Sequence, residues 1–195
     1  MNKRGEHYGI YLIIAAILIF IFIATTQQDK PTPTIPAAQI TPNIVQTGGN
    51  QQTLGTRNKT ADCTMNNWPY PDFDCTPGAI FTNVTVDQIC TPGYSASVRD
   101  VPESLKDKVY TEYNIIRIPY AFEVDHCISL EIAGSNDISN LWIESYNDSM
   151  GARTKDRVEN CLHRMVCNKT ISLPQAQYDV CHNWTKYLKE NGGTC

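Results

Sequence analysis

The stretch that decides the fold runs from Tyr120 to Trp142 and reads YAFEVDHCISLEIAGSNDISNLW. It contains an Asp125-His126 pair and ends in an Asn140-Leu-Trp triplet, with a Gly-Ser-Asn-Asp turn between the two. Because neighbouring side chains of a strand point to opposite faces, the pair can direct a carboxylate one way and an imidazole the other. Cleavage of a phosphodiester near neutral pH needs a base that activates water and a divalent cation that holds the phosphate. Asp125 and His126 could supply a metal ligand and a base, respectively.

The order of these residues resembles that of the bacterial HNH, or ββα-metal, nuclease family. The likeness extends upstream through residues 89–102, with the motifs I-C-T-P-G-Y-S and V-R-x-V-P. It extends downstream through residues 155–167, with the motif K-D-x-x-E-x-x-L-H-x-x-V-C. The resemblance implies an α+β fold class, with a small ββα-metal (HNH-like) core and flanking helices. It also implies endonuclease activity on a nucleic acid substrate.

The resemblance assigns roles to individual residues. His126 is expected to be the general base, Asp125 a metal ligand, and Asn140 the catalytic-site residue that braces the loop carrying His126. Family members place their last ligand, a His or Asn, at the start of the closing helix. This chain has Gly151 and Ala152 there, and neither side chain can bind a metal.

We expect Asp156 to complete the metal site, because it is the nearest carboxylate on the first exposed turn of that helix. Glu159 and His163 lie further along the same helix face and are alternative ligands. A hard cation prefers oxygen ligands, so Mg²⁺ or Mn²⁺ is the expected cofactor, with Zn²⁺ or Ni²⁺ as alternatives. The ordinary interpretation is that Asp156 pairs with Arg153 or Lys155 on the helix surface.

The charge balance argues against a non-specific binder of polyanions. The chain carries 16 Lys and Arg against 20 Asp and Glu, a formal net charge of -4, whereas phosphate affinity comes largely from basic side chains. Basic residues nevertheless gather in one short stretch: Arg153, Lys155, Arg157, Arg164 and Lys169. Such a run is usually a solvated helix face. The alternative, which we adopt as an expectation, is that Arg153 and Lys155, together with Arg99, contact phosphates.

The sequence divides into four segments. Residues 1–8 form a basic N-terminus that we expect to be cytoplasmic, and residues 9–26 a transmembrane anchor or signal peptide. The uncharged run GIYLIIAAILIFIFIA over residues 9–24 is at the short end of a bilayer span, and no small-x-small cleavage site follows it, which favours an anchor in the lipid bilayer. Residues 27–61 are rich in Gln, Thr, Pro and Asn and predict a flexible linker. Residues 62–195 are the expected HNH-like nuclease domain, and no protein partner is implied.

All eight cysteines follow the linker, in the part that we expect to be exported. Their even number predicts a disulfide framework, for which 105 pairings exist. A zinc site is the alternative, but the chain has no C-x-x-C pair. Cys127 lies beside His126, and we expect it to be bridged or buried instead of nucleophilic. The predicted location is a membrane-anchored protein with an extracytoplasmic C-terminal domain, or a secreted one if the N-terminal segment is cleaved.

Local patterns predict the elements around the Asp-His pair. Residues 100–103 have the proline and glutamate of a helix start. Residues 115–125 are rich in Ile, Tyr and Phe and should be extended, and residues 140–144 should form a second short strand. From Ala152 onward the apolar residues recur at helical spacing.

A last helix should begin after Ser172, whose hydroxyl can cap it, and end at Gly192-Gly193. Its apolar residues predict a buried stripe. Trp184 and His182 are therefore expected to be structural.

A second function class uses the same scaffold without catalysis. The Gly151-Ala152 position and the acidic net charge would suit a catalytically inactive HNH-like, disulfide-rich binding domain at the cell surface. Divalent-dependent cutting of plasmid or RNA separates the two classes.

Overall fold

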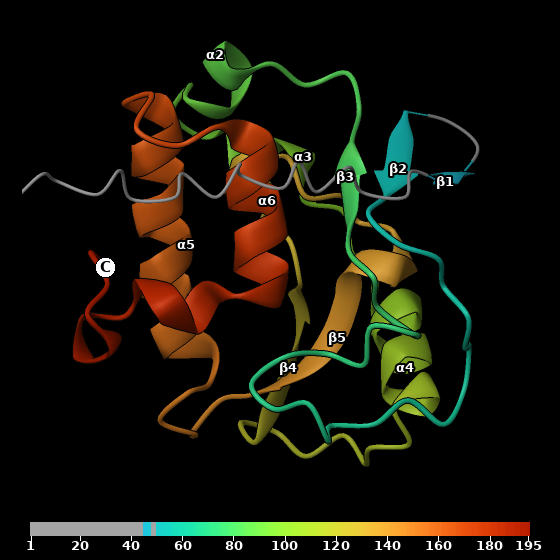
Figure 1. The fold of residues 1–195 in the computed structure, drawn as a ribbon. Helices are drawn as coiled ribbons and strands as arrows, with labels where there is room; N and C mark the ends of the chain where they lie inside the picture. Colours follow the sequence, from blue (N-terminus) through green and yellow to red (C-terminus); the bar gives the residue numbers. More distant parts are fainter. Residues whose placement is uncertain (1–44, 48–49) are drawn as a thin grey trace, which may run out of the picture. The chain divides into compact units, whose positions relative to one another are not determined.

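The computed structural model describes residues 45–47 and 50–195. This part of the chain is an α+β domain with two small antiparallel sheets and five α-helices. Figure 1 shows how they are arranged. The expected α+β class is confirmed. The elements are β1 Val45–Thr47, β2 Gln51–Thr53, β3 Ala79–Phe81, α2 Val86–Ile89, α3 Tyr94–Val98, α4 Glu103–Glu112, β4 Phe122–His126, β5 Leu141–Ser145, α5 Ala152–Cys167 and α6 Leu173–His182.

The folded part begins earlier than the sequence predicted. Strands β1, β2 and β3 form one antiparallel sheet in that order, so two strands lie inside residues 27–61, the expected linker. The guanidinium of Arg57 pairs with the buried Glu112 carboxylate and donates to the Cys75 carbonyl at 2.8 Å. The polar composition of this segment gave no sign of strands, and β2 forms by pairing with β3, which lies more than 20 residues later in the sequence.

The expected N-terminal segments 1–8 and 9–26 lie outside the described residues. Within residues 50–195 no helix is long and apolar enough to cross a membrane.

Strands β4 and β5 pair antiparallel, with Asp125 opposite Trp142. Both strands were predicted, but β4 is shorter than residues 115–125, because the first part of that range forms a loop. Pro119 has no backbone N–H to donate to a ladder, and Tyr120 has a left-handed backbone with φ 63°. Helix α5 follows β5, so strand, strand and helix succeed one another along the chain.

Helices α4 and α5 begin close to the predicted residues. Helix α4 starts at Glu103, with Pro102 in the N-cap position. Helix α5 starts at Ala152 and lies beside α6 (Figure 1). Its apolar buried face consists of Val158, Cys161, Leu162 and Val166. This face fixes α5 in the core and directs its first turns toward β4.

Helix α6 is capped by Ser172 as predicted, but it ends at His182 and not at Gly192. Asp179 accepts hydrogen bonds from two side chains of the following 3₁₀ turn, which draws the chain back across the helix end. The His182 ring stacks on an aromatic ring at each side. The buried Trp184 donates its indole N–H to a backbone carbonyl at 3.1 Å. This packing agrees with the structural role expected for both residues.

All eight cysteines are paired, in the bridges Cys63–Cys75, Cys90–Cys167, Cys127–Cys181 and Cys161–Cys195. The predicted disulfide framework is confirmed, and it supports an oxidising, extracytoplasmic location. The bridge at Cys127 ties the residue after β4 to α6, so the framework holds the end of β4 in place.

Candidate active site

His126 ends β4 and is buried, with 3% of its surface exposed. Its Nε2 lies 3.1 Å from Oδ1 of Asn136, whose Nδ2 donates to the Val98 carbonyl at 2.7 Å. Because a carbonyl only accepts, Asn136 presents its oxygen to His126, so the ring carries its hydrogen on Nε2 and keeps Nδ1 as proton acceptor. Burial lowers the pKa of His126 to about 4. The imidazole is therefore neutral near pH 7 and can act as a base.

Asn140 is fully buried and braces the loop that follows β4. Its Nδ2 donates to the carbonyls of Ile128 at 3.0 Å and Ser135 at 2.8 Å. Its Oδ1 accepts from the backbone N–H of Ile128 at 2.9 Å and of Ala79 at 3.3 Å. Because every polar atom of this side chain is engaged with backbone, Asn140 is a positioning residue and is not available to substrate.

Lys155 lies at the centre of a buried ion cluster and is only 2% exposed. Its Nζ donates to Oδ2 of Asp125 at 2.6 Å and to the His126 carbonyl at 2.9 Å. It also donates to the Glu159 carboxylate, and Oε2 of Glu144 lies 3.8 Å away. The expected phosphate contact of Lys155 is therefore corrected, because carboxylates enclose its ammonium. Glu159, an alternative metal ligand, is engaged by the same ammonium.

Electrostatics fix the charges in this cluster. Burial would lower the pKa of Lys155, but the facing carboxylates raise it well above its ordinary value. Burial would raise the pKa of Asp125, but the Lys155 charge holds it well below its usual range. Burial raises the pKa of Glu159 to about 7 and that of Glu144 well above its ordinary value. Near pH 7, Lys155 and Asp125 are charged, and Glu144 holds its proton more tightly than an exposed glutamate does.

Two more carboxyl groups lie within electrostatic reach of Asp125. Asp156 is exposed on α5, and burial of part of its side chain together with the Asp125 charge raises its pKa. Burial and the charges of Asp125 and Asp156 raise the pKa of Glu123 to about 7. Glu123 was not predicted. Strand alternation could have found it, since residues two apart on β4 share a face.

The donor set of Glu123, Asp125 and Asp156 suits a hard divalent cation. All three offer carboxylate oxygens, the ligands that Mg²⁺ and Mn²⁺ prefer. Asp125 is 20% exposed although Lys155 engages its Oδ2, so the carboxylate retains an open side. A bound cation would also relieve the mutual repulsion that raises the pKa of Glu123. In the part of the chain that the structure describes, however, the ligand atoms of these three carboxylates do not all lie within 4.8 Å of one another, so their chemistry suits such an ion but their side chains would have to move to share it.

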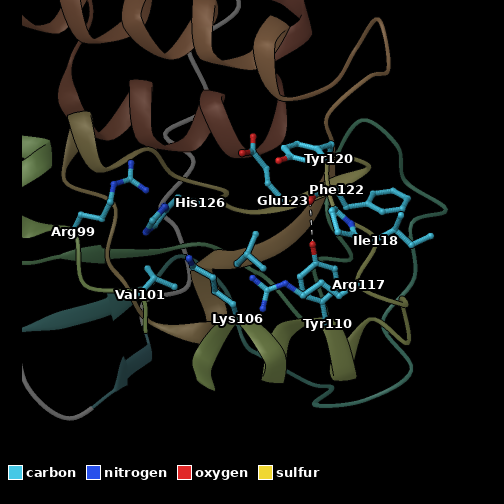
Figure 2. A pocket seen from close by; sticks show the side chains of 12 residues that line it. Arg99, Val101, Lys106, Tyr110, Arg117, Ile118, Tyr120, Phe122, Glu123 and His126 are labelled. Atoms are coloured by element: carbon cyan, nitrogen blue, oxygen red, sulfur yellow. Dashed lines mark hydrogen bonds between the residues drawn. The ribbon is translucent and has the colours of Figure 1, made fainter. Parts of the chain in front are cut away.

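A pocket of about 570 Å³ adjoins His126, and we call it the β4 pocket (Figure 2). Its basic and aromatic lining residues are Arg99, Lys106, Arg117, Tyr110, Tyr120 and Phe122. Arg99 is exposed and shares the pocket with His126, which suits its expected phosphate contact. Arg153 instead lies with its guanidinium 5.4 Å from the Tyr146 ring centre, on a surface that does not line this pocket.

His163, the other alternative ligand, lies away from this site. Its Nε2 is 2.9 Å from the Ile89 carbonyl, so this nitrogen carries a hydrogen and donates. Cys90 and Cys167 place their sulfurs close to the same ring. These two sulfurs form a disulfide. They are therefore not available as thiolate ligands, although the three side chains lie close enough together to hold a metal ion.

The site therefore combines a neutral buried histidine, a cluster of carboxylates with an open side and an arginine at a pocket. These residues come from β4, α5 and the segment before α4. No family model, curated protein or solved structure matches the chain.

Proposed function

We propose that this domain is a metal-dependent endonuclease of the HNH-like, ββα-metal type, which hydrolyses nucleic acid outside the cytoplasm. One observation carries the proposal. The neutral His126, with Nδ1 as its proton acceptor, follows Asp125 on β4, and the Asp125 charge acts on the pKa of His126. The succession of β4, β5 and α5 supports the proposal, because it matches the order of elements in that family.

In this proposal Nδ1 of His126 takes the proton from the attacking water. Asn136 holds Nε2, so the ring keeps its orientation while the proton moves. The Asp125 charge favours the imidazolium that results, since it acts to raise the pKa of His126. Arg99 holds a phosphate oxygen. Asp125, Asp156 and Glu123 would hold Mg²⁺ or Mn²⁺, which when bound polarises the phosphate and stabilises the developing negative charge.

A second candidate is a catalytically inactive binding domain on the same scaffold. The observation that favours it is the Lys155–Asp125 pair, because this ammonium already neutralises the carboxylate that a cation would need. In that case the Lys155 ammonium takes the place of a metal ion beside Asp125. The domain then binds its ligand without hydrolysing it.

Cutting assays with the oxidised full chain in detergent test the proposal. Plasmid and RNA are incubated with Mg²⁺, Mn²⁺, Zn²⁺ or EDTA. We expect cutting that EDTA abolishes. We expect His126→Ala to lower its rate by about 10²- to 10⁴-fold, the usual contribution of a general base.

His163→Gln is the matched control, because it removes a histidine on α5 that lies outside the site. It should cut at the wild-type rate. Intact near-ultraviolet circular dichroism of His126→Ala would show that the fold survives. Wild-type rates in a folded His126→Ala protein would exclude His126 from the mechanism, and the absence of cutting with every metal would favour the binding domain.

A further inference from the structure

Large apolar side chains are exposed on the loop between α4 and β4. Ile116, Ile118 and Tyr120 are 82%, 53% and 85% exposed. The loop is nonetheless held at its base, since Asn147 donates to the Tyr120 carbonyl at 3.1 Å. A fixed loop that presents apolar groups to water marks a binding surface.

This loop forms one wall of the β4 pocket. In the view of Figure 2, His126 and Arg99 lie toward one end and Ile118 and Tyr120 toward the other. The pocket therefore leads from the proposed general base to the exposed aromatic ring. A ligand that lies along the β4 pocket would therefore contact both His126 and Tyr120.

The lining offers the two kinds of contact that bind a nucleic acid strand. Aromatic rings stack on bases, and guanidinium and ammonium groups meet phosphates. Phe122 adds aromatic surface to the lining. Tyr110 is buried, with the Arg117 guanidinium 5.5 Å from its ring centre, and its hydroxyl donates to the Phe122 carbonyl at 3.1 Å, so it shapes the wall and does not stack on a base. A pocket of about 570 Å³ is the size of an ordinary small-ligand site. It has room for one or two nucleotides and not for a duplex.

The basic groups of the pocket are partly neutralised. Lys106 pairs with Glu103 at 2.6 Å, and Arg117 pairs with Glu103 at 2.7 Å and with Asp107 at 2.9 Å. Arg99 has no ion pair among the described residues of the chain, so it is the cation that remains open to phosphate. Stacking should therefore contribute more to affinity than charge does.

We propose that the β4 pocket binds an unpaired, single-stranded segment of nucleic acid, with a base stacked on Tyr120 and a phosphate at Arg99. This inference rests on the proposed function for its biological meaning, because it gives that site its substrate class. Bases in a duplex are stacked on each other and cannot reach these rings. The substrate is then a single strand, or a loop or end that is unpaired.

Binding in EDTA separates this inference from catalysis. Fluorescence anisotropy is measured with the oxidised full chain in detergent and a labelled strand of about 12 nucleotides, alone or paired with its complement. We expect the single strand to bind at least tenfold more tightly than the duplex. Tyr120→Ala should weaken single-strand binding about 5- to 150-fold, and Tyr120→Phe should restore it.

Ile116→Ala is the matched control, because Ile116 is exposed on the same loop but does not line the pocket. It should bind like the wild type. Equal affinities for single strand and duplex, or wild-type binding by a folded Tyr120→Ala protein, would overturn the inference. Binding without cutting leaves the inference intact and contradicts only the proposed nuclease activity.

The competing occupant is the lipid bilayer, into which an apolar loop could insert. Hydrogen exchange of residues 114–121 is compared for the full chain in lipid nanodiscs with and without the single strand. We expect protection of the loop only when the strand is added. If the nanodisc alone protects the loop from hydrogen exchange, and the strand adds no further protection, the loop binds the bilayer and the inference is wrong.

Discussion

The Lys155 ammonium lies 2.6 Å from Oδ2 of Asp125, in a cluster that water scarcely reaches. This pair joins the first turns of α5 to the end of β4. It also sets the charge of a carboxylate that we propose as a metal ligand. One contact therefore serves the packing of the domain and the electrostatics of its site.

Lys155→Met should lower the free energy of unfolding by about 3–5 kcal/mol, because it leaves buried carboxylates without their counter-charge. Chemical denaturation of the oxidised chain measures the change. Lys189→Met is the control, since Lys189 is exposed and pairs with no carboxylate among the described residues. A loss below about 1 kcal/mol for Lys155→Met would mean that the cluster contributes no more than a surface pair.

Glu144→Gln should stabilise the protein increasingly as pH rises above about 5. Glu144 is fully buried, and it lies beside the Lys155 ammonium and the Asp125 carboxylate. Burial raises its pKa well above the ordinary value, so the folded state keeps a proton that the unfolded state releases. The wild type thus loses stability as pH rises from the unfolded pKa toward the folded one, whereas the glutamine variant does not.

The gap between the two proteins should widen as pH rises above the unfolded pKa of a glutamate. Urea denaturation in EDTA at several pH values measures it, and the titration of His126 cancels in the difference. A gap that is constant with pH would show that Glu144 is ionised in the folded protein.

Local sequence patterns predicted secondary structure near the site. Features that depend on contacts between distant parts of the chain could not be predicted in this way. Composition and spacing placed β5 and the start of α5 close to where the structure has them, but they predicted too early a start for β4. Nothing local distinguished Lys155 from a solvated helix residue, because its burial follows from Asp125 and Glu144 approaching it from another part of the chain. The same reason explains the unpredicted strands β1 and β2 and the pairing of the cysteines.

The bridge Cys90–Cys167 should contribute more stability than Cys63–Cys75. The two close loops with sequence separations of 77 and 12 residues, and the longer loop restricts the unfolded chain more. The chain-entropy relation gives a difference of about 1.7 kcal/mol in the free energy of unfolding. Denaturation of the two double Cys→Ser variants measures it. Equal losses would indicate that packing around each bridge outweighs loop entropy.

Before any such comparison, a thiol titration of the denatured, oxidised wild type should find no free thiol, since all eight cysteines are paired. Six or more free thiols would contradict the disulfide framework and the extracytoplasmic location with it.

Asp156 decides between the nuclease and the inactive binding domain. It is exposed on α5, and burial of part of its side chain together with the Asp125 charge raises its pKa, so a cation in the space between the two carboxylates would relieve their repulsion. If a cation fills that space, Asp156→Asn should raise the metal concentration for half-maximal cutting at least about tenfold, the low end of the effect of losing even an outer-shell partner. Asp87→Asn changes an exposed carboxylate on α2 and should leave the metal dependence as it is.

Direct Mn²⁺ binding, followed by electron paramagnetic resonance, gives a readout that does not require cutting. Asp156→Asn should weaken it and Asp87→Asn should not. Wild-type Mn²⁺ affinity in Asp156→Asn would remove Asp156 from the site. If the wild type binds no Mn²⁺ at all, Lys155 is the only cation that Asp125 holds, and the domain binds its ligand without cutting it.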